Sequence, residues 1–290
     1  MEDRDWTILK VLYEQQNITR TAQILFISQP ALTNRLQQIE KEFGVQIVQR
    51  RRRGIAFTPE GEYLAKCANE MLLNINKIKD HVINMRGEVA GTLRLGVSNY
   101  FTRSKLPGIL ELFKNNYPDV EFKVVTGWSR DMFNQIYNQQ VHIGIVRGDY
   151  QWGGQKHLLF EETICIASRK EINADDLPGL SRIDYETDHL FKLLVNNWWS
   201  ENYAYSPVVG MEVDKVETCR EMVLKGLGYA IMPSLVLEGA PNIHKINITD
   251  KNGNPILKRT WMYYHQESLE LNLVNAFVHY VQGLDLSKPL

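Results

Sequence analysis

Apolar residues recur at helical spacing in two short segments near the N-terminus, residues 19–25 and 28–40. Thr19 is the expected N-cap of the first segment, because its hydroxyl can accept a hydrogen bond from an amide two or three residues on. The second segment starts with Ser28 at the cap position and Pro30 in the first turn, where a missing N–H is not needed. Its inward positions are Ala31, Leu32, Leu36 and Ile39. Two short helices joined by a tight turn are therefore predicted.

The outward face of the second helix carries amide, hydroxyl and guanidinium groups, the chemistry that reads base edges in the major groove of DNA. The pattern is typical of a helix-turn-helix, although helical hairpins that bind no DNA share it. A preceding helix is expected over residues 3–15, with Trp6, Leu9 and Tyr13 on one face. The expected DNA-contacting residues of the hairpin are Arg20, Thr21, Ser28, Gln29, Pro30, Ala31, Thr33, Asn34, Arg35 and Gln38.

A basic turn follows between two short strand-like segments, residues 45–48 and 55–58. It contains Arg50, Arg51, Arg52 and Arg53 and ends at a glycine. Such a hairpin beside a recognition helix predicts a wing that contacts the phosphate backbone or the minor groove. The alternative is a solvated basic loop.

A long helix is predicted from Pro59 to about residue 85, with Thr58 as its cap. Its apolar positions are spaced 4, 3, 4, 3, 4 and 3 residues apart, and they are Leu64, Ala68, Met71, Ile75, Ile78, Val82 and Met85. This 3.5-residue repeat is typical of a helix paired with another helix. At 1.5 Å per residue the helix is roughly 40 Å long. We expect it to form a dimer that presents two DNA-reading units one turn of DNA apart; a core-facing stripe is the alternative.

From residue 92 the pattern changes to alternating strands and helices. Strands are expected over residues 92–97, 120–125 and 142–146, helices over 105–115 and 129–139, and hairpin-like strands over 158–168. A later strand over 261–265 and a helix over 269–281 complete the chain. Helical crossovers between strands indicate parallel pairing. We therefore predict an α/β fold with three parts: a DNA-binding domain over 1–58, a linker helix over 59–86, and a two-lobed domain over 87–290. Lobe I is expected over about 92–160 plus 266–290 and lobe II over about 161–265.

Charge is unevenly distributed along the chain. The net charge is −1, but residues 15–58 carry seven Lys or Arg against two acids, so this segment is +5 and the rest is −6. A polyanionic partner is thus expected at the N-terminal end. The three cysteines are scattered, which favours reduced thiols over disulfides or a metal site. No apolar run approaches the ~18 residues that span a bilayer, and the acidic start is unlike a signal peptide. A cytoplasmic protein is expected.

A small-molecule site is predicted where strands of the α/β domain end. In open α/β sheets ligands bind at the carboxyl ends of the strands, where helix N-termini present free amides. The candidate residues are Ser98, Asn99, Tyr100, Thr126, Gly127, Trp128, Ser129 and Arg147. Two helix N-termini plus a guanidinium favour a carboxylate. The alternative is that both serines only cap helices and that Arg147 only pairs with Asp149 or Glu217.

Catalysis is not expected. The sequence has no HExxH, GxGxxG, Walker or GxSxG motif, and its seven histidines show no ligand spacing. No cofactor or metal is predicted.

Ordered motifs across the whole chain resemble the LysR-type family of bacterial transcriptional regulators. They are Thr21-Ala22, Ser28-Gln29-Pro30-Ala31-Leu32-Thr33, Leu36, Ile39-Glu40, Phe43-Gly44, Arg50, Arg53, Thr58-Pro59-Glu60-Gly61 and the segment 226–233, GLGYAIMP. Val48 and Asn34 depart from the common pattern, and Asn34 affects the expected operator preference. The resemblance implies a winged helix-turn-helix, a linker helix and a two-lobed effector domain similar to type II periplasmic binding proteins. It also implies tetramers built as dimers of dimers.

Three further segments, 126–129, 140–148 and 213–219, look like those of Gram-positive catabolite-control regulators that sense citrate and repress genes of the tricarboxylic-acid branch. The resemblance implies a DNA-binding regulator switched by a small carboxylate, with citrate as effector, in control of central carbon metabolism. The alternatives are a regulator of another pathway with a different effector, or a DNA-binding protein without an effector.

Overall fold

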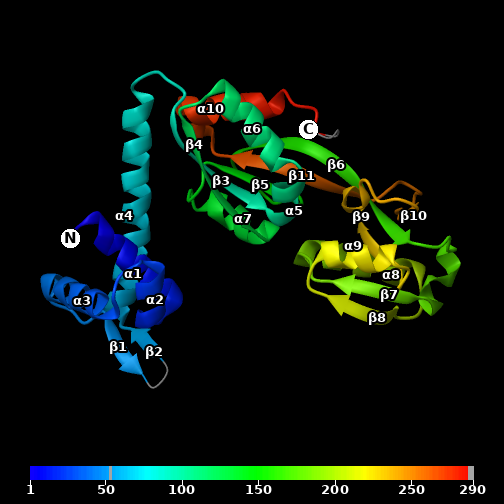
Figure 1. The fold of residues 1–290 in the computed structure, drawn as a ribbon, viewed down its shortest axis with the longest axis horizontal. Coiled ribbons are helices and arrows are strands. Elements are labelled where there is room, and N and C mark those ends of the chain that lie inside the picture. Colours follow the sequence, from blue (N-terminus) through cyan, green and yellow to red (C-terminus); the bar gives the residue numbers. More distant parts are fainter. Residues whose placement is uncertain (52–53, 287–290) are drawn as a thin grey trace. The chain divides into compact units, whose positions relative to one another are not determined.

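The computed structural model describes residues 1–51 and 54–286, and the chain divides into two compact units at Gly87 (Figure 1). The elements of the first unit are α1 (Asp3–Gln15), α2 (Ile18–Ile24), α3 (Gln29–Phe43), β1 (Val48–Arg51), β2 (Gly54–Phe57) and α4 (Pro59–Asn84). This order is the predicted winged helix-turn-helix followed by a long helix.

Side-chain caps fix where the helices of the first unit begin. Ser28 accepts from the amide of Ala31, and Thr58 accepts from the amide of Gly61, as the sequence predicts. The cap of α2 differs from the prediction, because Asn17 rather than Thr19 accepts from the Arg20 amide. Asn17 lies two residues before Thr19, so α2 starts at Ile18.

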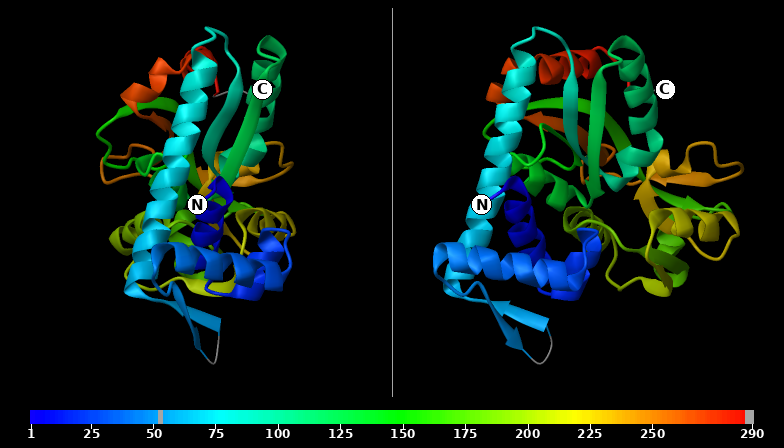
Figure 2. Two further views of the ribbon diagram at one scale, coloured as in Figure 1. Left: turned by 90° about the vertical axis from the view of Figure 1, so that its left-hand side faces the viewer. Right: turned by 60° about the vertical axis from the view of Figure 1, so that its left-hand side comes forward.

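The first unit is held together by α1, whose Leu9 and Leu12 are completely buried against residues of α3 and α4. Gly61 lets the start of α4 approach the backbone just before β1 closely. A Cβ at this position would lie 2.1 Å from the Ile47 carbonyl oxygen, so only glycine fits. The wing pairs Val48 with Phe57 and Arg51 with Gly54, and it projects from the helices beside α3 (Figure 2). Its first strand starts at Val48, three residues later than predicted.

The second unit contains two α/β lobes. Its elements are β3 (Gly91–Ser98), α5 (Asn99–Ser104), α6 (Leu106–Asn116), β4 (Val120–Gly127), α7 (Ser129–Tyr137), β5 (Ile143–Arg147), β6 (Gln155–Ser168), β7 (Ser181–Tyr185), α8 (His189–Asn202), β8 (Val208–Val213), α9 (Val216–Leu224), β9 (Ala230–Pro233), β10 (His244–Asn247), β11 (Leu257–Tyr264) and α10 (Asn272–Gln282). Short 3₁₀ turns lie at Ala174–Gly179, Ser234–Leu237 and Gln266–Glu270.

In lobe I the strand order is β4-β3-β5-β11-β6, with β3 parallel to both neighbours and β11 antiparallel. Helices α6 and α10 cover one face and α7 the other (Figure 1). In lobe II the end of β6 pairs with β9 and β10, and β7 pairs with β8 in parallel. Each lobe has its own core, around Phe113 and Phe277 in lobe I and around Trp198 and Tyr229 in lobe II.

Two long strands connect the lobes. The segment predicted as hairpin-like strands belongs to one 14-residue strand, β6. Its side chains change from partly exposed to continuously buried as the strand passes from lobe I into lobe II. Strand β11 leads the chain back into lobe I, where its residues 260–264 pair with β5. Lobe II therefore ends near residue 259 rather than 265. Among the helices of the described residues, none is both long and apolar enough to cross a membrane.

Candidate functional site

The polar face of α3 is open to solvent in the first unit. Gln29, Asn34 and Gln38 are exposed, as are Pro30 and Ala31. The sequence predicts an inward position for Ala31, but in the structure this residue lies on the outer face of α3. This surface presents amide groups with donors and acceptors side by side, which suits bidentate contacts to adenine.

Two residues that were predicted to contact DNA, Thr21 and Arg35, are buried or bound to another side chain in the structure. Thr21 is completely buried, so its hydroxyl is not on the surface that DNA would touch. Arg35 lies on α3, but its Nε and one NH2 nitrogen bind the two Asp5 carboxylate oxygens at 2.5 and 2.7 Å. Burial alone would raise the pKa of Asp5, yet the hydrogen bonds from Arg35 hold it below its usual value. Arg35 thus ties the recognition helix to α1 in this structure.

The basic residues beside the helix are only partly described. Arg20 and Arg51 are exposed, and Arg51 ends the first strand of the wing. The side chain of Arg50 and all of Arg52 and Arg53 lie outside the described residues, so their predicted contacts stay predictions. On α4 the predicted apolar stripe divides into two parts. Leu64 and Ala68 are buried, while Ile78 and Met85 are 63% and 77% exposed.

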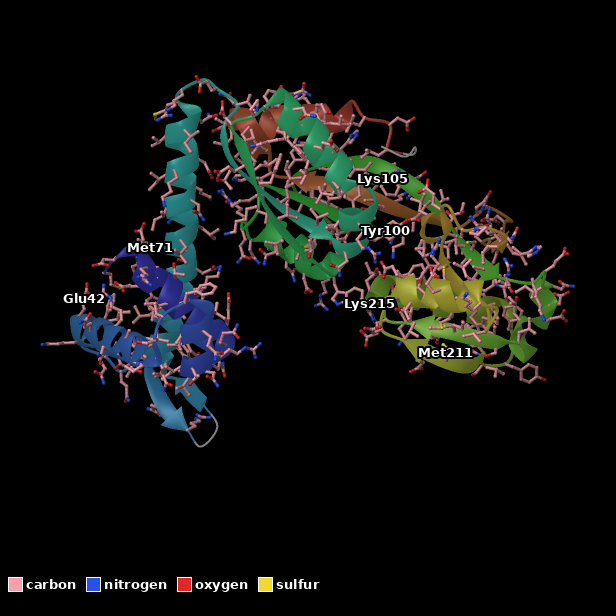
Figure 3. All side chains as sticks on the ribbon, viewed as in Figure 1. Glu42, Met71, Tyr100, Lys105, Met211 and Lys215 are labelled. Atoms are coloured by element: carbon pink, nitrogen blue, oxygen red, sulfur yellow. The ribbon has the colours of Figure 1, made fainter. Side chains whose placement is uncertain are left out.

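All eight predicted effector residues line one cavity of about 510 Å³ between the two lobes. Lobe I contributes the ends of β3, β4 and β5, and lobe II contributes residues 185–188 and 214–217. Figure 3 labels one residue from each wall, Tyr100 in lobe I and Lys215 in lobe II. The helices α5, α7 and α9 all begin at this cavity, one more than the sequence predicted.

Neither serine acts as a side-chain cap. Ser98 is only 3% exposed and precedes α5, yet its hydroxyl makes no capping bond and has no hydrogen-bond partner among the described residues. Ser129 is also buried, but it is the first residue of α7 rather than its cap, which is Trp128. Because a buried hydroxyl without a partner is unfavourable, the Ser98 hydroxyl is a group that a ligand would satisfy.

Arg147 pairs with a residue that sequence reasoning missed. Its buried guanidinium binds Glu162 of β6, and not Asp149 or Glu217, which pair with Lys156 and Arg103. The guanidinium also lies 4.2 Å from the centre of the Tyr100 ring. Its Nε has no hydrogen-bond partner among the described residues and so remains available as a donor.

A second buried ion pair lines the same cavity and was not predicted. Lys258 of β11 binds the Asp188 carboxylate at 2.9 Å and lies over the Phe191 ring. Burial, with the nearby Arg147 acting in the same direction, lowers the pKa of Lys258 to about 8. In the sequence Lys258 stands next to Arg259 in a strand, with nothing that singles it out, and its partner 70 residues away cannot be predicted from that segment.

Glu162 connects the cavity wall to lobe II. One carboxylate oxygen binds Arg147 of lobe I, and the other accepts the Leu235 amide of lobe II at 3.2 Å. A ligand that competes for Arg147 would therefore act on a contact shared by both lobes. No group of three or more His, Cys, Asp or Glu suited to a metal ion occurs in the described part of the chain.

Comparisons with known proteins match both units. The family model described as "Bacterial regulatory helix-turn-helix protein, lysR family" matches residues 4–62, and the model described as "LysR substrate binding domain" matches residues 86–284. YraN of Bacillus subtilis, an uncharacterized HTH-type transcriptional regulator, is 41% identical over 98% of both chains. YkuM of the same organism, with the same description, is 35% identical over the full length of both.

Solved structures show the same fold. The crystal structure of full-length CbnR, a LysR family transcriptional regulator, in complex with its target DNA has a TM-score of 0.67. The match covers 97% of this chain and 99% of that one at 18% sequence identity. Free CbnR gives a TM-score of 0.66.

Proposed function

Since this chain belongs to the LysR family of DNA-binding transcriptional regulators, which are not enzymes, we propose that a small carboxylate bound in the inter-lobe cavity switches its activity. The observation that carries this proposal is the Ser98 hydroxyl, buried in the cavity wall without a partner among the described residues. A buried hydroxyl without a hydrogen-bond partner is unfavourable, and a ligand that hydrogen-bonds to it would remove this penalty.

The carboxylate would lie against the lobe I wall. Ser98 and the free amides at the start of α7 supply neutral donors, and Arg147 supplies a charged one. Glu162 already balances the charge of Arg147, and Arg103 balances Glu217 on the opposite wall. Lys215 is the remaining cation of the lining with no ion pair in the described structure. The lobe II side of the lining also carries the carboxylates of Glu186 and Asp214, which are unpaired among the described residues, so the ligand carboxylate is placed against Ser98, Arg147 and the α7 amides of lobe I, and citrate is the compound that the family resemblance suggests.

The switch would act through the arrangement of two DNA-reading units. The exposed part of the α4 stripe, which includes Ile78 and Met85, supports pairing with a second copy. We place Gln29, Thr33, Asn34 and Gln38 in the major groove and the arginine wing on the phosphates. A dimer of dimers that represses genes of central carbon metabolism, in the cytoplasm, completes the proposal. A ligand changes DNA binding only if it has different affinities for two arrangements of the tetramer.

A thermal-shift screen of the full chain with mono-, di- and tricarboxylates tests this proposal. A ligand that binds only the folded state raises stability by about 2.7 kcal/mol at 100 times its Kd. Citrate or a related acid is expected to raise the midpoint in the wild type, and the shift is expected to be smaller in Ser98→Ala. A response to a different class of compound would favour another effector. No response to any compound would favour a regulator without one.

A further inference from the structure

A second and larger cavity, of about 670 Å³, shares part of its lining with the first but is built mainly from lobe II residues. Its walls are the sheet residues Arg182, Asp184 and Glu212 on one side and the α8 residues Phe191 and Lys192, with Val195 and Asn196, on the other. The residues that line both cavities are Trp128, Tyr185, Glu186, Thr187 and Asp214. Ser98, Ser129 and Arg147 line only the first.

Arg182 is the central polar residue of this second cavity. It is 7% exposed, and Asp184 takes one edge of its guanidinium, with Nε at 2.6 Å and one NH2 nitrogen at 2.9 Å from the two carboxylate oxygens. Only the 2.9 Å contact is a hydrogen bond, and both Nε and the third nitrogen, Nη1, have no hydrogen-bond partner within the described residues. The ring of Trp199 lies 5.4 Å from the guanidinium carbon and holds the group in place. A buried donor of this kind requires an acceptor oxygen.

The rim of the cavity has the opposite charge. Because Asp184 neutralises Arg182, the charges that remain are the carboxylates of Glu186, Glu212 and Asp214 and the ammonium of Lys192. None of these four forms an ion pair in the described part of the chain. The cavity thus has a net charge of about −2 by count of its lining groups, which favours a cationic ligand.

We infer that this lobe II cavity binds a small diamino acid, with its carboxylate on Arg182 and its ammonium groups toward the acidic rim. The acceptor oxygen satisfies Nη1, and the positive charges are attracted by Glu186, Glu212 and Asp214. Phe191 and Val195 offer apolar contact for the methylene chain. Since the two cavities share five lining residues, occupancy of one is expected to change the affinity of the other, a coupling that must be reciprocal.

Calorimetry on the full chain with three related probes tests the ligand class. L-lysine carries both charges, L-norleucine lacks the side-chain ammonium, and cadaverine lacks the carboxylate. L-lysine is expected to bind at least about tenfold more tightly than either of the others, because hydrogen bonds to charged groups are the strong ones. Equal affinities for all three, or no heat with any of them, would overturn the inference.

Two exposed residues that line only the second cavity give variants of opposite sign. Glu212→Gln removes an attractive charge and is expected to weaken L-lysine binding by about tenfold. Lys192→Gln removes a repulsive charge and is expected to strengthen it by several fold. A purely structural effect would not change sign between them, so a loss of affinity in both variants would contradict the assignment.

Ser98→Ala separates this site from the effector cavity. L-lysine binding is expected to persist in Ser98→Ala while carboxylate binding falls, and Glu212→Gln is expected to show the reverse. If L-lysine binding is lost in Ser98→Ala and unchanged in Glu212→Gln, the diamino acid occupies the effector cavity and the second site is wrong. If carboxylates fail to bind but L-lysine binds with the predicted variant pattern, only the proposed effector is wrong.

Discussion

Replacement of Ser98 by alanine should change stability and ligand affinity in opposite senses. The hydroxyl is buried and has no hydrogen-bond partner among the described residues. Deleting a buried hydroxyl of this kind removes an unfavourable group, so the free energy of unfolding should stay the same or rise by up to about 1 kcal/mol. A hydrogen bond to a charged ligand contributes about 1.5–3 kcal/mol. Carboxylate affinity should therefore fall by roughly 10- to 100-fold.

Urea unfolding and calorimetry measure the two effects on the same protein. Ser104→Ala is the matched control, because Ser104 ends α5, the helix that Ser98 precedes, is exposed, donates to the Tyr100 carbonyl and does not line the cavity. It should leave carboxylate affinity unchanged. If Ser98→Ala instead loses more than about 1 kcal/mol of stability and keeps its affinity, the Ser98 hydroxyl serves the fold, and the reasoning from an unsatisfied donor is refuted.

Three further predictions concern the first unit. Arg52→Ala combined with Arg53→Ala should weaken binding to all DNA sequences. It should also flatten the slope of log affinity against log salt by about 1.8, at 0.9 for each phosphate contact. An unchanged slope in gel-shift titrations would exclude phosphate contacts by these two arginines. Ile78→Glu should dissociate the dimer in analytical ultracentrifugation without unfolding the chain, since the residue is 63% exposed, whereas Lys79→Glu should leave the dimer intact. Asp5→Asn should lower the free energy of unfolding by about 2 kcal/mol at pH 7, less than the 3–5 kcal/mol of a fully buried pair, because its guanidinium partner is partly exposed. Since the folded-state pKa of Asp5 is lowered, its contribution is present above the unfolded value near 3.9 and is lost as pH falls through the folded value. Denaturation curves of the two proteins should therefore converge in acid, and a pH-independent difference would contradict this account.

Local signals predicted most of the fold. The helix over residues 3–15, the caps at Ser28 and Thr58, and the long helix from Pro59 follow from spacing and cap chemistry, and the structure confirms them. The wrong boundaries lie where tertiary context decides. Strand β6 read as a hairpin because a strand that crosses between two cores changes its burial pattern halfway along.

The cavity shows the same limit. All eight predicted residues meet there because each lies at the carboxyl end of a strand or just after it, and chain order predicts that position. The partners of the charged groups could not be predicted. Arg147 binds Glu162 and Arg35 binds Asp5, and both pairs join residues that are distant in sequence. The two partners that the sequence suggested for Arg147, Asp149 and Glu217, pair with Lys156 and Arg103 instead.

A small carboxylate in the inter-lobe cavity is proposed to change how the protein binds its operator. Footprinting of the operator by the wild type and by Ser98→Ala, each with and without citrate, tests it most directly. Citrate is expected to change the affinity or the extent of protection in the wild type, by the 5- to 150-fold typical of coupled sites, and to have little effect on Ser98→Ala. Identical protection with and without citrate in the wild type, under conditions where calorimetry shows the ligand bound, would contradict it.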